Sequence, residues 1–178
     1  MMRDCYILQV MTGREAYYIT HAYNYLGKDR ENLHLFVPRR EMTIRRKGKR
    51  LVTRKPIFPG YVFWECDEPE EQIQWRLKRT PGFIRFLRRE SGVLSPISAA
   101  DRKLITHLIT GGDICGASQV TFDRDNRIVA LSGPLKGYEG SIIKVDRRKQ
   151  RAQVKFLLND KTFLIYFEYR EIRQADMQ

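Results

Sequence analysis

Positive charge is concentrated in two short stretches of the chain, and phosphate groups are what such charge binds best. Residues 39–55 hold nine Lys or Arg and one Glu. Residues 144–151 hold five Lys or Arg, with Asp146 as the one acid among them. Spaced cations of this kind contact backbone phosphates and give affinity for nucleic acid without reading its sequence. For any single residue the alternative is a solvated charged surface without a ligand.

No combination of residues predicts catalysis or metal binding. The sequence contains no nucleophile elbow, no Walker A loop and no His–carboxylate motif. Glu68, Glu70 and Glu71 lie close together, but Pro69 divides them, and they fit a helix start, where acids favour the dipole. Cys5, Cys66 and Cys115 are far apart and lack CxxC spacing, which argues against disulfides and zinc. We therefore expect a non-enzymatic protein with no cofactor and no metal.

The bulk properties favour a polyanionic partner. The 178 residues carry a net charge of +12 and a pI of about 9.8, which favours nucleic acid over a basic protein without such a partner. Hydrophobic residues make up 42% of the chain, enough for a core. No apolar run approaches the roughly 18 residues of a membrane span, and no secretory signal opens the chain. These features predict a cytoplasmic protein with reduced cysteines and no membrane contact.

The first part of the chain alternates strand-like and helix-like patterns. Thr12 and Glu15 have capping-box spacing, an apolar stripe from Ala16 to Leu26 follows, and Gly27 is a natural helix stop. Other periodic runs predict four strands and two more helices. The predicted strands are 5–11, 34–37, 61–66 and 82–87, and the further helices are 68–77 and 99–109, the latter capped by Ser98.

Two further patterns are typical of β-structure. Residues 41–45 and 49–54 are strand-like around a Gly48 turn, which predicts a protruding basic β-hairpin. Beyond residue 126 the chain predicts four or five short strands, with Asn159-Asp160 as a two-residue hairpin turn. We expect an α+β N-terminal domain over residues 1–109, with an antiparallel sheet flanked by helices. A linker over 110–125 and a small all-β barrel over 126–178 complete the predicted organisation.

One loop near the C-terminus makes this outline specific. Leu131–Gly140 holds Gly133, Gly137, Gly140 and a proline between two β-patterned runs, followed by a basic segment. This layout resembles a KOW motif, found in small SH3-like barrels of transcription factors and ribosomal proteins. Earlier strings follow the order of an NGN domain, above all Phe-Pro-Gly-Tyr-Val at 58–62. The whole chain thus resembles the NusG-type elongation and antitermination factors, which have an NGN and a KOW domain.

Within that family the KOW strings are similar to LoaP-type antiterminators. Those paralogs act on selected operons and are linked to RNA-hairpin recognition. The string Phe-Pro-Gly-Tyr-Val-Phe at 58–63 with Glu65 is also similar to RfaH-type paralogs, which recognise a paused complex through exposed DNA. We favour the LoaP-like assignment.

The resemblance implies binding surfaces for polymerase and for DNA. An NGN domain docks an aromatic cavity onto the clamp helices of RNA polymerase, and the matching positions are Tyr6, Phe58, Tyr61, Phe63 and Phe83. Because Tyr61 and Phe63 share one strand face, we expect one face in the core and the other partly open, with ordinary core burial as the alternative. A docked NGN domain also touches the non-template DNA strand. The candidates for that contact are Arg14, His21, Arg45, Arg46, Lys47, Lys49 and Arg50.

On the barrel, basic side chains beside the Gly-rich turn fit an RNA backbone, and Tyr138 fits stacking on an unpaired base. The candidate RNA contacts are Lys136, Tyr138, Lys144, Arg147, Arg148, Lys149 and Arg151. In the general factor of the family the same barrel binds ribosomal protein S10 or Rho, which is the alternative here. The resemblance also implies a monomer.

Four functions follow in order of preference. The first is an antitermination factor that holds polymerase in a processive state, suppresses pausing in selected operons and contacts nascent RNA. The second is a general NusG that couples polymerase to the ribosome or Rho. A KOW-containing ribosomal or rRNA-binding protein is third, and the NGN-like half argues against it. A nucleic-acid enzyme is fourth, since the sequence lacks a catalytic set.

Overall fold

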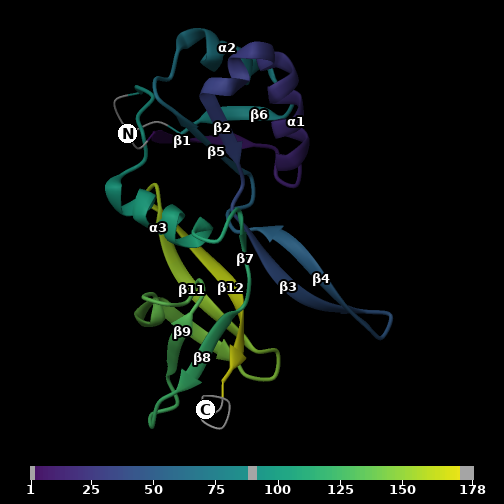
Figure 1. Cartoon of the computed structure of the whole chain (residues 1–178), viewed down its shortest axis with the longest axis vertical. Coiled ribbons are helices and arrows are strands. Elements are labelled where there is room, and N and C mark those ends of the chain that lie inside the picture. Colours follow the sequence, from purple (N-terminus) through teal and green to yellow (C-terminus); the bar gives the residue numbers. More distant parts are fainter. Residues whose placement is uncertain (1–2, 88–91, 173–178) are drawn as a thin grey trace. The chain divides into compact units, whose positions relative to one another are not determined.

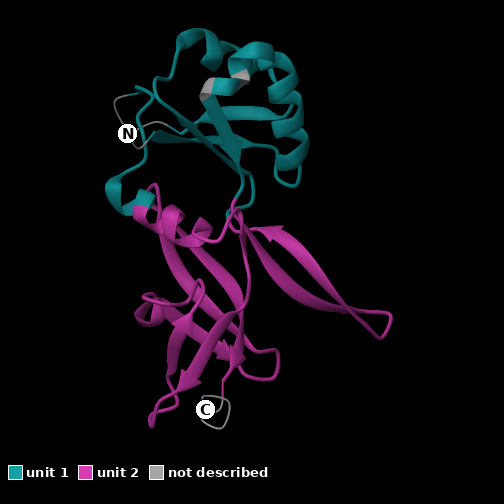
Figure 2. Cartoon of the chain, viewed as in Figure 1, with its two compact units in different colours: residues 1–37, 58–102 teal, residues 38–57, 103–178 magenta. Residues whose placement is uncertain are grey.

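The computed structural model describes residues 3–87 and 92–172, and these fall into two compact units (Figures 1 and 2). Unit 1 comprises residues 1–37 and 58–102, and unit 2 comprises residues 38–57 and 103–178. An α+β first part and an all-β C-terminal part confirm the predicted fold class. No helix among the described residues is long and apolar enough to cross a membrane.

Unit 1 is an antiparallel four-stranded sheet in the order β2-β5-β1-β6. The strands are rich in β-branched and aromatic residues, which suit a pleated, buried surface. The helices follow β1 and β5 along the chain. The bounds are β1 Asp4–Val10, α1 Glu15–Leu26, η1 Gly27–Asn32, β2 Leu33–Phe36, β5 Tyr61–Cys66, α2 Glu71–Arg79 and β6 Phe83–Phe86.

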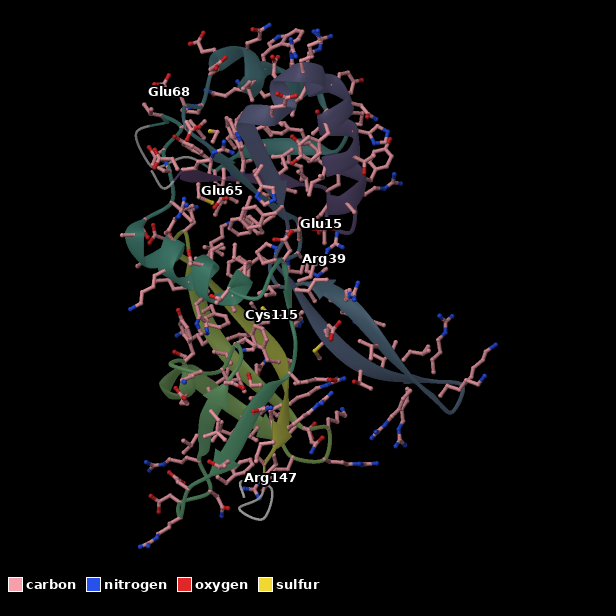
Figure 3. The ribbon with its side chains drawn as sticks, in the orientation of Figure 1. Glu15, Arg39, Glu65, Glu68, Cys115 and Arg147 are labelled. Atoms are coloured by element: carbon pink, nitrogen blue, oxygen red, sulfur yellow. The ribbon has the colours of Figure 1, made fainter. Side chains whose placement is uncertain are left out.

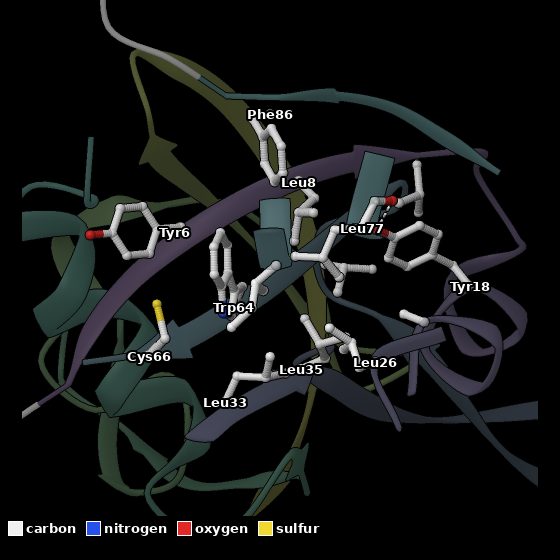
Figure 4. Close-up of a cluster of buried hydrophobic side chains, with 14 of the residues drawn as sticks. Tyr6, Leu8, Tyr18, Leu26, Leu33, Leu35, Trp64, Cys66, Leu77 and Phe86 are labelled. Atoms are coloured by element: carbon white, nitrogen blue, oxygen red, sulfur yellow. Dashed lines mark hydrogen bonds between the residues drawn. The ribbon is translucent and has the colours of Figure 1, made fainter. Parts of the chain in front are cut away.

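One hydrophobic cluster joins the two helices to the sheet (Figure 4). Tyr18, Ala22 and Leu26 recur at helical spacing on α1, so that a single face meets the strands. Trp64 is fully buried, and its ring centroid lies 5.2 Å from that of Tyr6 on the neighbouring strand. The Tyr18 hydroxyl donates to the Leu77 carbonyl at 2.9 Å, which ties α1 to α2. Burial of these rings against the sheet is the main stabilisation of this unit.

Helix α1 begins differently from the prediction. Its N-cap is Arg14, with no side-chain cap, so the expected Thr12 capping box is wrong. Glu15 takes over part of the role, since its Oε1 accepts from Gly13 N at 3.1 Å. The same oxygen accepts from Gly60 N at 2.7 Å, and the carboxylate is thus held by two backbone donors. Glu15 thus binds the backbone of Gly60 and does not form the predicted capping box with Thr12.

Unit 2 contains a five-stranded sheet in the order β10-β11-β12-β8-β9. All neighbouring pairs are antiparallel except β12 and β8. Asn159 and Asp160 both have positive φ, 47° and 60°, which fits the predicted tight turn between β11 and β12. The bounds are β8 Ser118–Phe122, β9 Ile128–Ser132, η2 Glu139–Ser141, β10 Ile142–Asp146, β11 Arg151–Leu158 and β12 Lys161–Glu171.

The basic hairpin belongs to unit 2 as well (Figure 2). Its strands, β3 Arg39–Arg46 and β4 Lys49–Pro56, pair in register around a Lys47-Gly48 turn in which both residues have positive φ. A short strand, β7 Ile114–Cys115, extends the hairpin in parallel. Helix α3, Ala99–Ile109, begins at the predicted Ser98 cap, whose Oγ accepts from Asp101 N at 3.1 Å.

The segment 110–125, which the sequence analysis assigns to a linker, contains β7 and β8. Ser118 and Val120 on β8 are fully buried, and β8 lies between β12 and β9 in the sheet. One pairing partner of β8, strand β12, is about 50 residues away in sequence, and local periodicity carries no sign of this contact. Residues 173–178 of the predicted barrel lie outside the described residues.

Candidate nucleic-acid and protein interfaces

The Phe-Pro-Gly-Tyr string is held where β5 begins. Gly60 has φ +82° and a Cβ there would lie 2.8 Å from Thr12 Oγ1, so only glycine fits without a shift. Val10 N donates to Gly60 O at 2.8 Å, and Gly60 N donates to Glu15. Three segments of unit 1 therefore fix this turn, and with it the course of the strand that carries Tyr61 and Phe63.

The five residues predicted to bind polymerase do not form one open cavity. Tyr6 belongs to the hydrophobic cluster that joins the helices to the sheet, and Phe83 packs against that cluster. Phe58 and Phe63 form a separate aromatic group with Phe36, with ring centroids 6.1 Å and 5.5 Å from that of Phe63. These aromatic contacts fill the face that the sequence predicts to be partly open, and Tyr61 and Phe63 are 7% and 0% exposed. The expectation of an open face is therefore wrong. Of the five predicted residues, only Phe83 is partly exposed.

On α1, two of the predicted DNA-binding residues are connected through a third that the sequence analysis missed. The Arg14 guanidinium lies 5.4 Å from the ring centroid of Tyr17, and Tyr17 stacks on His21 at 3.8 Å. His21 Nδ1 also lies 2.9 Å from the Tyr17 carbonyl. Because residues three and four apart are neighbours on a helix, the spacing of Arg14, Tyr17 and His21 could have placed Tyr17 beside the other two. The result is an exposed, preassembled column of one cation and two rings.

The remaining five DNA candidates lie at the hairpin end and are exposed. Arg45 faces Arg50 across the two strands, and Arg46 faces Lys49 next to the turn. Like charges directly opposite each other in a sheet are destabilising. Two successive pairs of this kind are therefore better explained by a polyanionic ligand than by stability.

The barrel holds this hairpin through Thr43, in the middle of β3. Glu168 accepts from Thr43 N at 2.6 Å and from Thr43 Oγ1 at 3.0 Å. Arg151 donates to the Thr43 carbonyl at 2.5 Å and pairs with Glu168 at 3.3 Å. We call Thr43, Arg151 and Glu168 the clamp. Arg151 was predicted to bind RNA, and the structure gives it this structural contact in addition.

Next to the clamp, Arg40 lies 5.9 Å from the Phe167 ring centroid. Burial, followed by the charge of Arg151, lowers the pKa of Arg40. The positive charge of Arg151 on the barrel thus acts on Arg40 of β3.

The glycines of the KOW turn have different roles. Gly133 has φ +85°, and a Cβ there would lie 2.7 Å from Ser118 Cα. Ser118 Oγ accepts from Leu135 N at 3.0 Å, so β8 and the turn are packed backbone to backbone. Gly137 has φ +81° in open space, and Gly140 lies in η2. The turn therefore needs glycine at position 133 for close approach and at position 137 for its backbone angle alone.

The predicted RNA residues of the barrel do not gather at one place. Tyr138 is half-buried between His107 and Phe156, with centroids 5.0 Å and 5.2 Å away, and is no free stacking platform. The Arg147 guanidinium lies 4.0 Å from the Phe122 ring and donates to Asn126, beside the barrel strands (Figure 3). Lys136, Lys144, Arg148 and Lys149 are exposed.

Apolar side chains on the outer face of the barrel form a second kind of surface. Leu157 and Leu164 are 60% and 53% exposed on the paired strands β11 and β12. Lys155 is paired with Leu164, which gives the patch a basic edge. Exposed leucines on adjacent strands are typical of a protein-binding surface. The sequence predicts short strands here without indicating which face of each strand is exposed.

Comparison with known proteins agrees with this architecture. Residues 3–106 match the family model described as transcription termination factor nusG. The chain is 21% identical over 179 residues to the transcription termination/antitermination protein NusG of Pseudomonas aeruginosa, covering 98% of this chain and all of the relative. It is 28% identical over 170 residues to the protein of that name from Treponema pallidum, covering 86% and 89%.

One solved structure shows the same fold. The structure titled "Domain interaction in Thermotoga maritima NusG" superimposes with a TM-score of 0.63 at 16% identity. The match covers 93% of each chain. Both units of the present chain are therefore represented in that architecture.

Proposed function

Since the chain belongs to the NusG family of transcription termination and antitermination factors, we propose that it is a non-enzymatic factor that binds RNA polymerase and suppresses pausing and termination in selected operons. It contacts nascent RNA through the basic side chains of unit 2. The observation that carries the nucleic-acid contact is the pairing of Arg45 with Arg50 and of Arg46 with Lys49 on the hairpin. That arrangement costs stability unless a polyanion neutralises it.

Polymerase binding is assigned to unit 1, whose described residues all lie within the residues 3–106 that the family model matches. Phe83 is the accessible member of the aromatic set, and Ile84 beside it is 52% exposed. The two side chains point to opposite faces of β6, and a protein partner that covers this edge strand gains from desolvating them. Phe58 and Phe63 are fully buried, so their contribution is to shape this unit, and their removal costs core packing.

The column of Arg14, Tyr17 and His21 is assigned to DNA. A ring stacked between a cation and an imidazole on an exposed helix face is suited to contact an unpaired base and its phosphate. This contact would place the non-template strand against α1.

Single-round transcription through an intrinsic terminator tests the proposal. Adding the protein to bacterial core polymerase and sigma factor should raise read-through, and the protein should co-purify with core polymerase. Phe83→Ala should weaken co-purification, whereas Trp75→Ala, which removes an exposed ring on α2, should not. Read-through equal to that without protein on every template, with no polymerase association, would refute the assignment.

A second candidate function is coupling of polymerase to a protein partner. The exposed Leu157 and Leu164 favour it, because an apolar patch on a barrel face suits a protein surface and not a phosphate backbone. Ribosomal protein S10 and Rho are the partners to test. Leu157→Ser with Leu164→Ser should abolish such binding and leave RNA affinity unchanged.

A further inference from the structure

Unit 2 has a groove between the hairpin and the barrel that none of the assignments above uses as a whole. Its volume is about 760 Å³. One wall is a single face of the hairpin, with Thr43 and Arg45 on β3 and Arg50 and Val52 on β4. The other wall is the turn between β10 and β11 together with the end of β12. The two walls are about 100 residues apart in sequence, and only the fold brings them together.

The groove is strongly basic. Six basic side chains and two carboxylates line it. Both carboxylates already have partners. Glu41 pairs with Arg54 at 3.4 Å, and Glu168 contacts Thr43 and Arg151. Four of the arginines form no ion pair within the part of the chain that the structure describes. The basic residues of the lining are Arg45, Arg50, Arg148, Lys149, Arg151 and Arg170.

The walls are fixed relative to each other by the clamp. Glu168 and Arg151 bind the N–H and the carbonyl of Thr43, so β3 is attached to the barrel at the floor of the groove. Because both clamp partners on the barrel are themselves lining residues, Arg151 is held and the strands that carry the other cations are fixed before a ligand arrives. Preorganised charge costs less to bring to a ligand than flexible charge does.

The lining favours a phosphate backbone over unpaired bases. Its one aromatic residue, Tyr169, is 2% exposed, so there is no platform on which a base could stack. Double-stranded RNA is recognised chiefly through its shape and its phosphates. We propose that the hairpin and the barrel together form one binding groove for the phosphate backbone of a base-paired RNA stem. This inference deepens the RNA contact of the proposed function and rests on it.

The experiment is a titration of the full chain against a labelled RNA hairpin at about 150 mM salt, where non-specific attraction is weakened. One variant neutralises the hairpin wall, Arg45→Gln with Arg50→Gln. A second neutralises the barrel wall, Arg148→Gln with Arg170→Gln. All four side chains are exposed, so the fold should be retained. The matched control, Arg124→Gln with Arg127→Gln, removes two exposed charges of the same unit outside the groove.

Each wall variant should lose roughly tenfold in affinity, and the slope of log K against log salt should fall by about 1 per residue removed. The control should lose less than about threefold. Equal losses in the control and wall variants would overturn the groove in favour of diffuse attraction. Loss from only one wall would overturn the single site. A DNA hairpin of the same sequence bound more tightly than the RNA would overturn the RNA assignment.

The proposed function fails in a different way. If the wild-type chain binds no RNA hairpin at this salt, the RNA contact itself is refuted, before any variant is compared. If wild-type binding is tight and the wall variants bind equally well, only the groove is refuted.

Discussion

At the scale of single residues, the KOW turn depends on glycine for two separable reasons. Gly133→Ala should destabilise unit 2 the most, because the new methyl would meet the Ser118 backbone at 2.7 Å in addition to the strain of a positive φ. Gly137→Ala should cost about 1 kcal/mol, from the backbone angle alone. Gly140→Ala, in open space, should be close to neutral. Urea unfolding of the three variants measures the order, and a Gly133→Ala variant as stable as Gly140→Ala would contradict it.

Also at residue scale, the three cysteines should be chemically inert in the folded chain. Burial raises the pKa of Cys5, Cys66 and Cys115 from 9.0 to about 12. Since the thiolate is the reactive form, this rise leaves the three thiols almost entirely protonated and unreactive below pH 9. Alkylation by iodoacetamide at pH 8 should therefore be slow in native protein and fast in urea. Rapid labelling of any one cysteine in the native protein would contradict its burial.

Ionisation of the three cysteines should lower the free energy of unfolding at alkaline pH. Their pKa values are raised in the folded state, so the stabilisation is fully present below pH 9 and is lost as pH rises towards 12. Burial also raises the pKa of Tyr6 to about 12, which adds to the loss. The free energy of unfolding, measured in urea between pH 8 and 11, should decrease with pH. Constant stability over that range would contradict the prediction.

At the scale of elements, the clamp decides where the basic hairpin lies. Glu168→Ala removes both acceptors of Thr43 and leaves Arg151 without its carboxylate. Amide exchange at Thr43 should then speed up by roughly tenfold or more, the equivalent of losing about 1.5 kcal/mol for a bond to a charged group. Glu171→Ala removes an exposed carboxylate at the end of the same strand and is the control. Unchanged protection of Thr43 in the Glu168 variant would show that strand pairing alone holds the hairpin.

At the scale of the whole molecule, the boundary of the barrel lies earlier than the sequence suggests. A fragment of residues 126–178 lacks β8, which separates β12 from β9 in the sheet, so β9 loses its neighbour. Such a fragment should not unfold cooperatively, whereas residues 113–178 should, because they restore the buried Ser118 and Val120. Circular dichroism during urea unfolding separates the two. Cooperative unfolding of the shorter fragment would contradict this reading of the sheet.

The sequence by itself determined the local elements and the class of partner. Period-2 and period-3.6 patterns predicted the strands of unit 1, α1 and α3, and the turns at Gly48 and Asn159-Asp160. These are set by neighbouring residues, whose spacing and backbone angles are legible along the chain. Net charge is also legible without coordinates, as is the resemblance of the first part of the chain to the family, which the match at residues 3–106 confirms.

Only the tertiary structure decided which residues meet. Glu15 contacts Gly60, Thr43 contacts Glu168, and β8 pairs with β12, all across separations that periodicity cannot report. The exposure of side chains also depends on such distant contacts. Alternation shows that Tyr61 and Phe63 share a strand face, but only the packing of Phe36 and Phe58 shows that this face is filled. Two basic stretches that look separate in sequence line one groove for the same reason. Contacts between distant segments depend on how the whole chain closes on itself, and that is a property of the fold and not of any window of residues.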